Sequence, residues 1–483
     1  MIWGDIIEMW MKKGKTLLRV TAFLVVFAVC FFVVQSAFGV DQLGAYLHNR
    51  GFLHEKAGSL DGVYIGASNV HAYWQPLVGW NEYGISVYDY SFDGMPVGAV
   101  RYLLEAARTR HPDALFIINI NQFRNRENQG TSDVVAKLHR SLDYMPISIT
   151  KARVVSGLAR SFSLTFQEQL ELMLPIIPFH SRWNELDGWA LGAETTDYKS
   201  SRSNRDFLMD QKDYSRKYTI IDDRQDREEI ITTAFDELMD YIDSSGARVL
   251  FVKVPQSMIK SKQKYLNTIE DMVLERGYPC LDLHENIDST YIDPKWDFYN
   301  GNHTNVHGSL KYTHSLGAYL VEHYGFADKR GTPGWESWDE AGERYYKLLS
   351  SYALPFELEN EPRVKLDAPE LGKAEADGQT ITVSWSSSEG AGGYQIYRKS
   401  AKDGNRWVLA GETDNETFTW RDSDRKPSTE YTYTVVPCRR EGDGWRYGSF
   451  DIHGVSAKTA ADKAAKEKAA EPDGEEESEE DEE

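Results

Sequence analysis

Residues 62–68 read GVYIGAS, a short β-rich run that ends in small residues and a serine. Similar apolar runs recur further along the chain, at 84–89 (GISVYD), 114–120 (ALFIINI), 248–254 (RVLFVKV) and 279–283. Segments with the apolar spacing of amphipathic helices lie among them, at 97–110, 228–242, 263–275 and 308–324. This alternation predicts an α/β fold with three layers, a parallel sheet covered by helices on both faces. Ligands of such sheets bind at the carboxyl ends of the strands, where Ser68 is expected.

The alternation of strands and helices is interrupted between residues 122 and 227. This interruption predicts an insertion at the edge of the site, either a lid or a partner surface. The insertion contains Arg182 and Trp183. An arginine beside an aromatic residue can stack on a sugar or pair with a phosphate, or it can be a structural anchor.

The N-terminal region, residues 1–41, carries an uncharged apolar run at 20–34 (VTAFLVVFAVCFFVV). Basic residues precede this run, at Lys12, Lys13, Lys15 and Arg19. The pattern predicts one transmembrane helix with its positive flank in the cytoplasm, so the bulk of the chain is expected outside, attached to the cell membrane. An uncleaved anchor is favoured by the length of the run; cleavage near residues 37–39 (AFG) is the alternative.

The composition changes beyond Pro333. Residues 331–361 are expected to form a helical connector between two separate units. Period-two segments then follow at 380–385, 393–398, 407–409, 417–420 and 431–436, which predicts an all-β sandwich. Over residues 362–459 the sequence resembles a fibronectin type III domain, on Trp385, the GYQIYR strand and Tyr431-x-Tyr433-x-Val435. The resemblance implies seven strands, Trp385 in the core, Tyr431 as the corner tyrosine, and no catalytic chemistry in this unit. Residues 460–483 are Ala/Lys/Glu-rich and then acidic, and are expected to be a disordered tail.

Charge and cysteine content exclude several classes of protein. The 483 residues carry 54 basic and 75 acidic side chains, a net charge of −21, which argues against a nucleic acid partner. The three cysteines, Cys30, Cys280 and Cys438, have no zinc-like spacing, and the last two lie in different predicted domains, so no bridge is expected. We find no nucleotide-binding fingerprint and no metal-ligand cluster, and therefore expect no cofactor.

Three segments are expected to meet at the sheet edge: 66–69 (GASN), 91–94 (SFDG) and 297–303 (DFYNGNH). Ser68 could supply a nucleophilic hydroxyl and His303 the imidazole that takes its proton. The N–H groups of Ser68 and Gly94 could form an oxyanion hole, to which Asn119 or Asn121 could add a side-chain donor. The alternative for Ser68 is a helix cap, and for His303 a loop residue.

Three further histidines are secondary candidates. His71, three residues after Ser68, could line the pocket or be a polar residue of a helix turn. His307 and His314 fall on the helix predicted at 308–324 or just before it, and are expected to face solvent.

From residue 62 to residue 325, within a domain at 42–330, the sequence resembles the SGNH/GDSL hydrolase superfamily. The Gly-x-Ser motif matches 66–68, and the histidine motif matches Asn300-Gly301-Asn302-His303-x-Asn305-x-x-Gly308. The match makes Ser68 the nucleophile, His303 the base and Gly94 the glycine of the second block. In place of the acid three residues before the histidine the sequence has Asn300, with Asp297 as the nearest alternative acid, and the glycine of the third-block Gly-x-Asn is absent.

The resemblance implies a membrane-anchored Gram-positive branch, related to proteins of teichoic acid D-alanylation and exopolysaccharide acetylation. The expected function is that of a serine esterase or O-acyltransferase acting on acyl esters of cell-envelope glycopolymers. The alternative is a catalytically degenerate domain that binds envelope polysaccharide or assists a membrane-bound acyltransferase. A third reading, adhesion through the sandwich, is disfavoured by the single sandwich and the large α/β domain.

Overall fold

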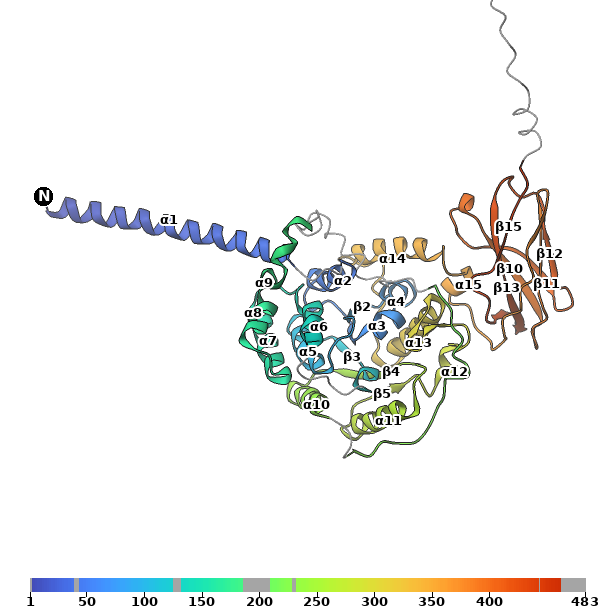
Figure 1. The fold of residues 1–483 in the computed structure, drawn as a ribbon, viewed down its shortest axis with the longest axis horizontal. Coiled ribbons are helices and arrows are strands. Elements are labelled where there is room, and N and C mark those ends of the chain that lie inside the picture. The colour runs from blue at the N-terminus through green and yellow to red at the C-terminus, as the bar shows by residue number, and fades with distance from the viewer. Residues whose placement is uncertain are drawn as a thin grey trace, which may run out of the picture.

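The computed structural model describes residues 2–38, 43–124, 132–185, 209–227, 232–442 and 444–461. A long helix α1 (Ile2–Ala37) leads into an α/β domain, which is followed by a β domain (Figure 1). From residue 462 on, the predicted acidic tail lies outside the described residues. The cysteines Cys30, Cys280 and Cys438 are free.

The parallel sheet predicted from the sequence is confirmed. Its strands are β1 (Gly62–Gly66), β2 (Val87–Ser91), β3 (Leu115–Asn119), β4 (Val249–Lys253) and β5 (Cys280–Asp282). They pair in the order 2-1-3-4-5, and all pairs are parallel. This order reverses direction between β1 and β3, and such a switch point opens a crevice at the carboxyl ends of the strands.

Each face of the sheet has its own core, because successive strand residues point to opposite sides. Val63 and Ile65 belong to one cluster and Tyr64 to the other. The first cluster packs under α5 (Val100–Arg110), α10 (Thr233–Ser245) and α11 (Lys260–Glu275). The second packs under α3 (Ser68–Tyr73) and α13 (Val306–Tyr324). The expected three-layer arrangement is therefore present.

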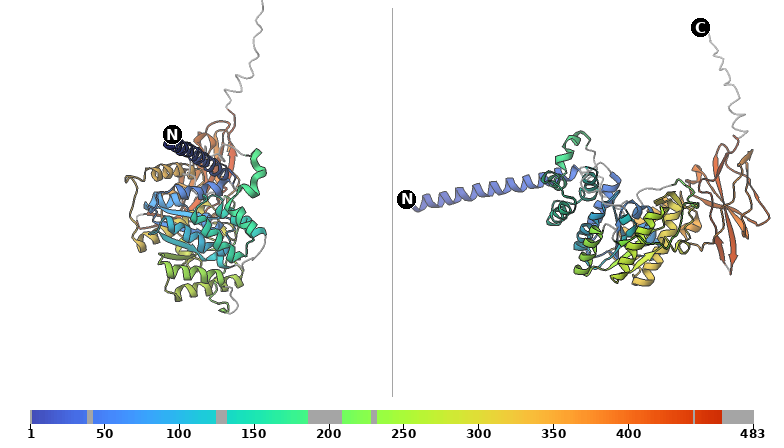
Figure 2. Two further views of the ribbon diagram at one scale, coloured as in Figure 1. Left: turned by 90° about the vertical axis from the view of Figure 1, so that its left-hand side faces the viewer. Right: turned by 60° about the horizontal axis from the view of Figure 1, so that its bottom comes forward.

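The remaining helices of the α/β domain vary in length from one turn to 14 residues. They are α2 (Leu43–His54), α4 (Pro76–Tyr83), η1 (Val97–Ala99) and α12 (Ile287–Thr290), and in the insertion η2 (Ile120–Arg124), α6 (Ser132–Leu142), α7 (Ile149–Phe162), α8 (Phe166–Met173), α9 (Ile176–Phe179) and η3 (His180–Glu185). Helices α7 to α9 gather on the side from which α1 leaves (Figure 2). Residues 209–227 run without regular structure past α11, where the N–H of Gln225 bonds to the carbonyl of Lys264.

A two-stranded hairpin that the sequence did not predict precedes α13. It pairs β6 (Phe298–Asn300) with β7 (His303–Thr304). The Asn305 side chain caps α13 by accepting from the N–H groups of His307 and Gly308. A β-carbon on Gly308 would lie within 2.9 Å of Thr304 Cβ, so glycine is needed for the hairpin to pack this closely on the helix.

The connector is helical and contacts both domains. In α14 (Glu336–Leu349), Trp338 packs on Trp80 of α4 with ring centroids 5.3 Å apart. In α15 (Pro355–Leu358), Phe356 stacks on Tyr447 of the β domain at 4.3 Å. A Glu357 oxygen lies 2.9 Å from Nδ1 of a histidine of α13.

That histidine is His307, which the sequence placed in solvent. It is 2% exposed, and His314, also expected in solvent, is 7% exposed. Both predictions are wrong because α15 covers this face of α13: the Glu357 carboxylate contacts His307, and the Glu357 carbonyl lies 3.2 Å from His314 Nε2.

The β domain consists of two antiparallel sheets, as predicted. One pairs β8 (Glu375–Asp377), β9 (Thr380–Ser384) and β12 (Thr419–Asp422). The other pairs β10 (Gly393–Lys399), β11 (Val408–Asp414), β13 (Glu430–Glu441), β14 (Gly444–Tyr447) and β15 (Val455–Lys458), with η6 (Ala401–Asp403) between strands. Trp385 is buried, and the Tyr431 hydroxyl accepts the N–H of Lys426 at 3.0 Å, a bond typical of a tyrosine corner.

The apolar part of α1, Lys13–Gln35, is 23 residues long, and its most apolar stretch of 18 residues has a mean hydropathy of 2.7. It is long and apolar enough to be a membrane anchor, and a signal sequence would have the same character.

Candidate active site

The first strand ends in a turn that small residues make possible. A β-carbon on Gly66 would overlap Val70 and lie 3.2 Å from Asn119 Cβ. Ser68 begins α3 two residues later, and the carbonyl of Gly66 accepts the N–H of Phe92 at 3.1 Å. Two of the three segments expected at the sheet edge, 66–69 and 91–94, thus meet at the carboxyl end of β1.

Ser68 and His303 are in direct contact, although 235 residues separate them in the sequence. Ser68 Oγ lies 2.8 Å from His303 Nε2. Ser68 comes from the turn after β1, and His303 is the first residue of β7. The arrangement is that of a hydroxyl nucleophile with an adjacent imidazole.

Asn300 holds the other side of the imidazole. Its Oδ1 accepts the N–H groups of Asn302 at 2.9 Å and His303 at 3.1 Å. The atom that faces two N–H donors must be the oxygen, so the amide nitrogen faces His303 Nδ1, at 2.9 Å. An N–H of Asn300 then donates to Nδ1. In a neutral imidazole this places the ring proton on Nε2, where it points to Ser68.

This tautomer is the opposite of the one a general base needs. To accept the Ser68 proton, Nε2 must be unprotonated and Nδ1 must carry the ring hydrogen. A carboxylate at position 300 would impose that state, whereas the amide opposes it. Asn300 therefore differs from a carboxylate in the ring proton that it favours as well as in its charge.

Asp297 does not replace the missing acid in the structure. Its Oδ2 pairs with Lys311 Nζ at 2.7 Å and accepts the N–H of Asp293 at 2.6 Å. The Asp297 side chain is nearly fully buried, and the position beside His303 Nδ1 is taken by Asn300. The expectation that Asp297 supplies the acid is corrected accordingly: its carboxylate is already bound in a buried ion pair.

The two asparagines proposed as oxyanion donors differ in availability. Asn121 uses both ends of its amide on the backbone of Val254, the residue after β4: its Nδ2 donates to the Val254 carbonyl at 3.0 Å and its Oδ1 accepts the Val254 N–H at 2.8 Å. Its amide is therefore committed to the backbone, which corrects that candidate. Asn119 Oδ1 accepts the N–H of Asn121, while its buried Nδ2 has no hydrogen-bond partner among the described residues. Gly94 adopts φ +65°, a conformation that favours glycine, in the loop after β2.

The candidates for substrate contact lie differently from one another. His71 is buried between two segments of the site edge, with Nδ1 3.2 Å from Ser91 Oγ and Nε2 3.5 Å from Asp93 Oδ1. It links α3 to the loop after β2. Arg182 and Trp183 fall in η3, and their side chains lie outside the part of the chain that the structure describes.

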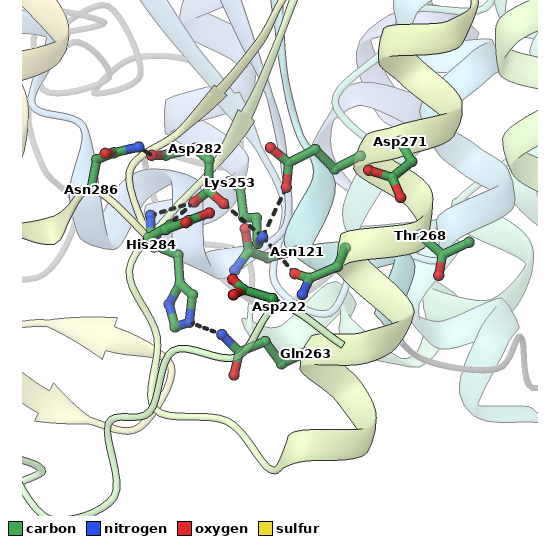
Figure 3. A network of polar contacts seen from close by, with 12 residues as sticks. Asn121, Asp222, Lys253, Gln263, Thr268, Asp271, Asp282, His284 and Asn286 are labelled. Carbon is green, nitrogen blue, oxygen red and sulfur yellow. Dashed lines mark hydrogen bonds and ion pairs between the residues drawn. The ribbon is translucent and has the colours of Figure 1, made fainter. Parts of the chain in front are cut away.

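A buried polar network that the sequence analysis missed lies at the ends of β4 and β5 (Figure 3). Lys253, at the end of β4, pairs with Asp282 at 2.7 Å and Glu270 at 2.9 Å. Burial alone lowers the pKa of Lys253, but these two carboxylates raise it above its usual value. A lysine inside the apolar run RVLFVKV was the signal for this ion pair.

The network extends to the hairpin that carries His303. Burial lowers the pKa of His284 to about 4, so this ring is neutral and can accept the N–H of Gln256 at Nδ1, 3.3 Å away. The Gln256 side chain in turn donates to the carbonyl of Asn302 at 3.0 Å. The ends of β4 and β5 thereby help to fix the turn between Asn300 and His303. Within the described ranges, no group of three or more His, Cys, Asp or Glu side chains is placed to hold a metal ion.

Comparison with known proteins gives limited results. No family model matches the chain, and no curated protein matches it. Parts of 87 solved chains are similar to it. The chain is similar to FN3tt at 20% sequence identity, over 20% of this chain and 97% of that one, with a TM-score of 0.16. It is similar to the FN5 domain of Drosophila Lar at 22% identity, over 20% of this chain and 97% of that one, with a TM-score of 0.16.

A further similarity is to a beta-1,2-glucanase from Parabacteroides distasonis, at 22% identity over 21% of this chain, with a TM-score of 0.17. The chain covers 14% of the length of that glucanase.

Proposed function

We propose that the protein is a membrane-anchored, extracytoplasmic serine esterase or O-acyltransferase of the SGNH/GDSL hydrolase type. Its substrates would be acyl esters of cell-envelope glycopolymers, and a fibronectin type III domain would follow the catalytic domain. The observation that carries the proposal is the 2.8 Å contact between Ser68 Oγ and His303 Nε2 at the carboxyl edge of a parallel sheet. The motifs around Ser68 and His303 that resemble this superfamily support the class of reaction, and the basic residues before the apolar run support the orientation.

The mechanism follows from the two side chains. Ser68 Oγ attacks the acyl carbon as His303 Nε2 removes the hydroxyl proton, and the carbonyl electron pair moves onto oxygen. The N–H groups of Ser68 and Gly94, with the unpaired Asn119 Nδ2, are the donors proposed for that oxyanion. Collapse breaks the ester bond, and His303 gives its proton to the departing sugar hydroxyl. Water or a second hydroxyl then removes the acyl group from Ser68, giving hydrolysis or transfer.

The amide of Asn300 favours a second candidate, in which the domain binds an acylated polymer or assists a membrane-bound acyltransferase without cleaving the ester itself. In this candidate Nε2–H donates to Ser68, and the pair acts as a fixed polar surface. A Ser–His site with the wrong ring proton is slow because only a minor tautomer can accept the serine proton.

Labelling with a fluorophosphonate probe separates the two candidates. The purified full-length protein should react at Ser68, and Ser68→Ala should abolish the labelling without changing the melting temperature. His303→Ala should reduce the rate nearly as much, because the two residues act as one unit. Labelling that persists in Ser68→Ala refutes the esterase mechanism, and absence of labelling in the native protein supports the binding candidate.

A further inference from the structure

The insertion leaves an apolar stripe uncovered on α8 and α9. Phe166, Leu170 and Met173 lie at intervals of four and three residues on one face of α8, and Ile177 follows in α9 after the break at Leu174 and Pro175. Phe166 is 75% exposed, Ile177 39% and Leu170 37%, and Met173 is half-buried. Nearby, Ile149 at the start of α7 is 74% exposed. Large apolar side chains grouped in this way mark an interaction surface.

The Ile177 end of the stripe lies where the apolar span of α1 ends. The N–H of Ile176 donates to Gln35 Oε1 at 3.3 Å, and Gln35 is the last residue of the span. Phe32, about one turn inside the span, lines a hollow of about 300 Å³ together with Met145 and Pro175. Helices α7, α8 and α9 all lie on the side of the α/β domain from which α1 leaves (Figures 1 and 2).

We propose that the stripe Phe166–Leu170–Ile177 lies in the interfacial layer of the membrane that α1 crosses, so that lipid acyl chains cover it. The inference rests on the proposed function in one respect, the uncleaved anchor. Gln35 then sits at the membrane surface, and its contact with Ile176 holds the next residue, Ile177, at the same level. Amphipathic helices of this kind bury their apolar face about 5–10 Å into the headgroup and acyl boundary.

The charges of α7, the helix next to the stripe, favour an anionic lipid surface as the partner. Helix α7 contains Lys151, Arg153 and Arg160 and no acidic residue, and both arginines are exposed, whereas α8 itself carries Glu168 and Glu171. Exposed arginines beside an apolar stripe suit anionic headgroups next to acyl chains. Contact at α1 and at the stripe gives the α/β domain two attachments, which fix its orientation above the bilayer.

Nitroxide accessibility in vesicles tests the proposal. The full-length protein carrying Phe166→Cys or Leu170→Cys, with Cys30→Ala, is spin-labelled and reconstituted into phosphatidylcholine–phosphatidylglycerol vesicles. The matched control is Leu409→Cys in β11, where the side chain is 48% exposed. The remaining thiols do not compete, because burial raises the pKa of Cys280 and raises that of Cys438 to about 12. We expect oxygen collisions to exceed collisions with a soluble nickel chelate severalfold at 166 and 170, and the reverse at 409.

Labelling the native Cys30, in the middle of the span, reports on the anchor separately. If Cys30 is in the bilayer while positions 166 and 170 are as exposed to nickel as 409, the stripe proposal is overturned and the anchor stands. If Cys30 is itself in water, the anchor fails and the inference fails with it. If positions 166 and 170 are shielded from both reagents in native membranes and reach water in pure lipid vesicles, a protein covers the stripe, which also overturns the proposal.

Discussion

In an Asn300→Asp variant, one carboxylate oxygen keeps the bonds from the N–H groups of Asn302 and His303, now 2.9 and 3.1 Å long. The other oxygen takes the place of the amide nitrogen, 2.9 Å from His303 Nδ1. A carboxylate only accepts hydrogen bonds, so Nδ1 must then carry the ring proton. Nε2 is then unprotonated and can accept the proton of Ser68. We therefore expect the turnover of an acyl ester to increase.

The size of the gain follows from the same tautomer argument. In a serine protease triad, replacing the acid by its amide lowers kcat about 10⁴-fold. The reverse change therefore has an upper limit of about 10⁴, or about 5 kcal/mol of barrier. Asn300 and His303 are only partly buried, so solvent screens some of the added charge. We expect an increase of about 10² to 10⁴.

The assay is hydrolysis of p-nitrophenyl acetate together with the rate of fluorophosphonate labelling, each measured from pH 5 to 9. The new carboxylate raises the pKa of His303, so the rising limb of kcat/KM should move to higher pH. Asn300→Leu is the control: it removes the amide donor without adding charge, and should gain much less. An Asn300→Asp protein that melts like the native one and reacts no faster would refute the tautomer argument.

Three further outcomes follow from the packing. Asp297→Asn should leave kcat of the folded protein nearly unchanged. It should lower the free energy of unfolding, measured in urea, by about 3 kcal/mol, because Lys311 loses its counter-charge. A loss of kcat of about 10⁴-fold would instead make Asp297 the acid. Burial opposes ionisation of Glu357, but His307 and Arg363 lower its pKa to about 2, so the protein should lose stability as pH falls from about 4.5 to 2. Glu357→Gln should flatten this dependence of stability on pH, and an unchanged slope in the variant would contradict the role of Glu357. A fragment of residues 351–461 should be more stable than one of 362–461 by about 3 kcal/mol, because Leu354 and Phe356 add two buried apolar side chains to the core of the sandwich; equal urea midpoints would show that this segment does not stabilise it.

The sheet could be predicted because its signals are local. Each central strand is a short apolar run, and the run at 114–120 corresponds to β3 at Leu115–Asn119. The second strand was placed early, at 84–89, whereas β2 is Val87–Ser91. Its pairing with β1 begins at Gly62↔Val87, and the buried Asp89 in its middle interrupts the apolar pattern that marks the other strands.

The parts that could not be predicted depend on contacts between distant segments. The two strands of the hairpin that carries His303 contain only five residues together. On one side the hairpin is held by a distant residue, Lys212, whose N–H donates to the carbonyl of Phe298. His307 was predicted to be a surface residue because nothing near it in the sequence indicates its contact with Glu357, 50 positions later. Likewise, nothing in the sequence indicates that the backbone of Val254 occupies both ends of the Asn121 amide, which leaves that amide no donor for an oxyanion.

Residue 300 has a structural role and a chemical role that use different atoms. The structural role belongs to Oδ1, which holds the turn through the N–H groups of Asn302 and His303. Asparagine and aspartate provide this oxygen equally well. The chemical role belongs to the other terminal atom, which sets the proton of the His303 ring. Because the fold depends only on the first atom, the hairpin can keep its shape while the site changes between a slow and a fast form. A Ser–His contact of 2.8 Å is therefore compatible with either form, and rate measurements on the residue 300 variants decide between them.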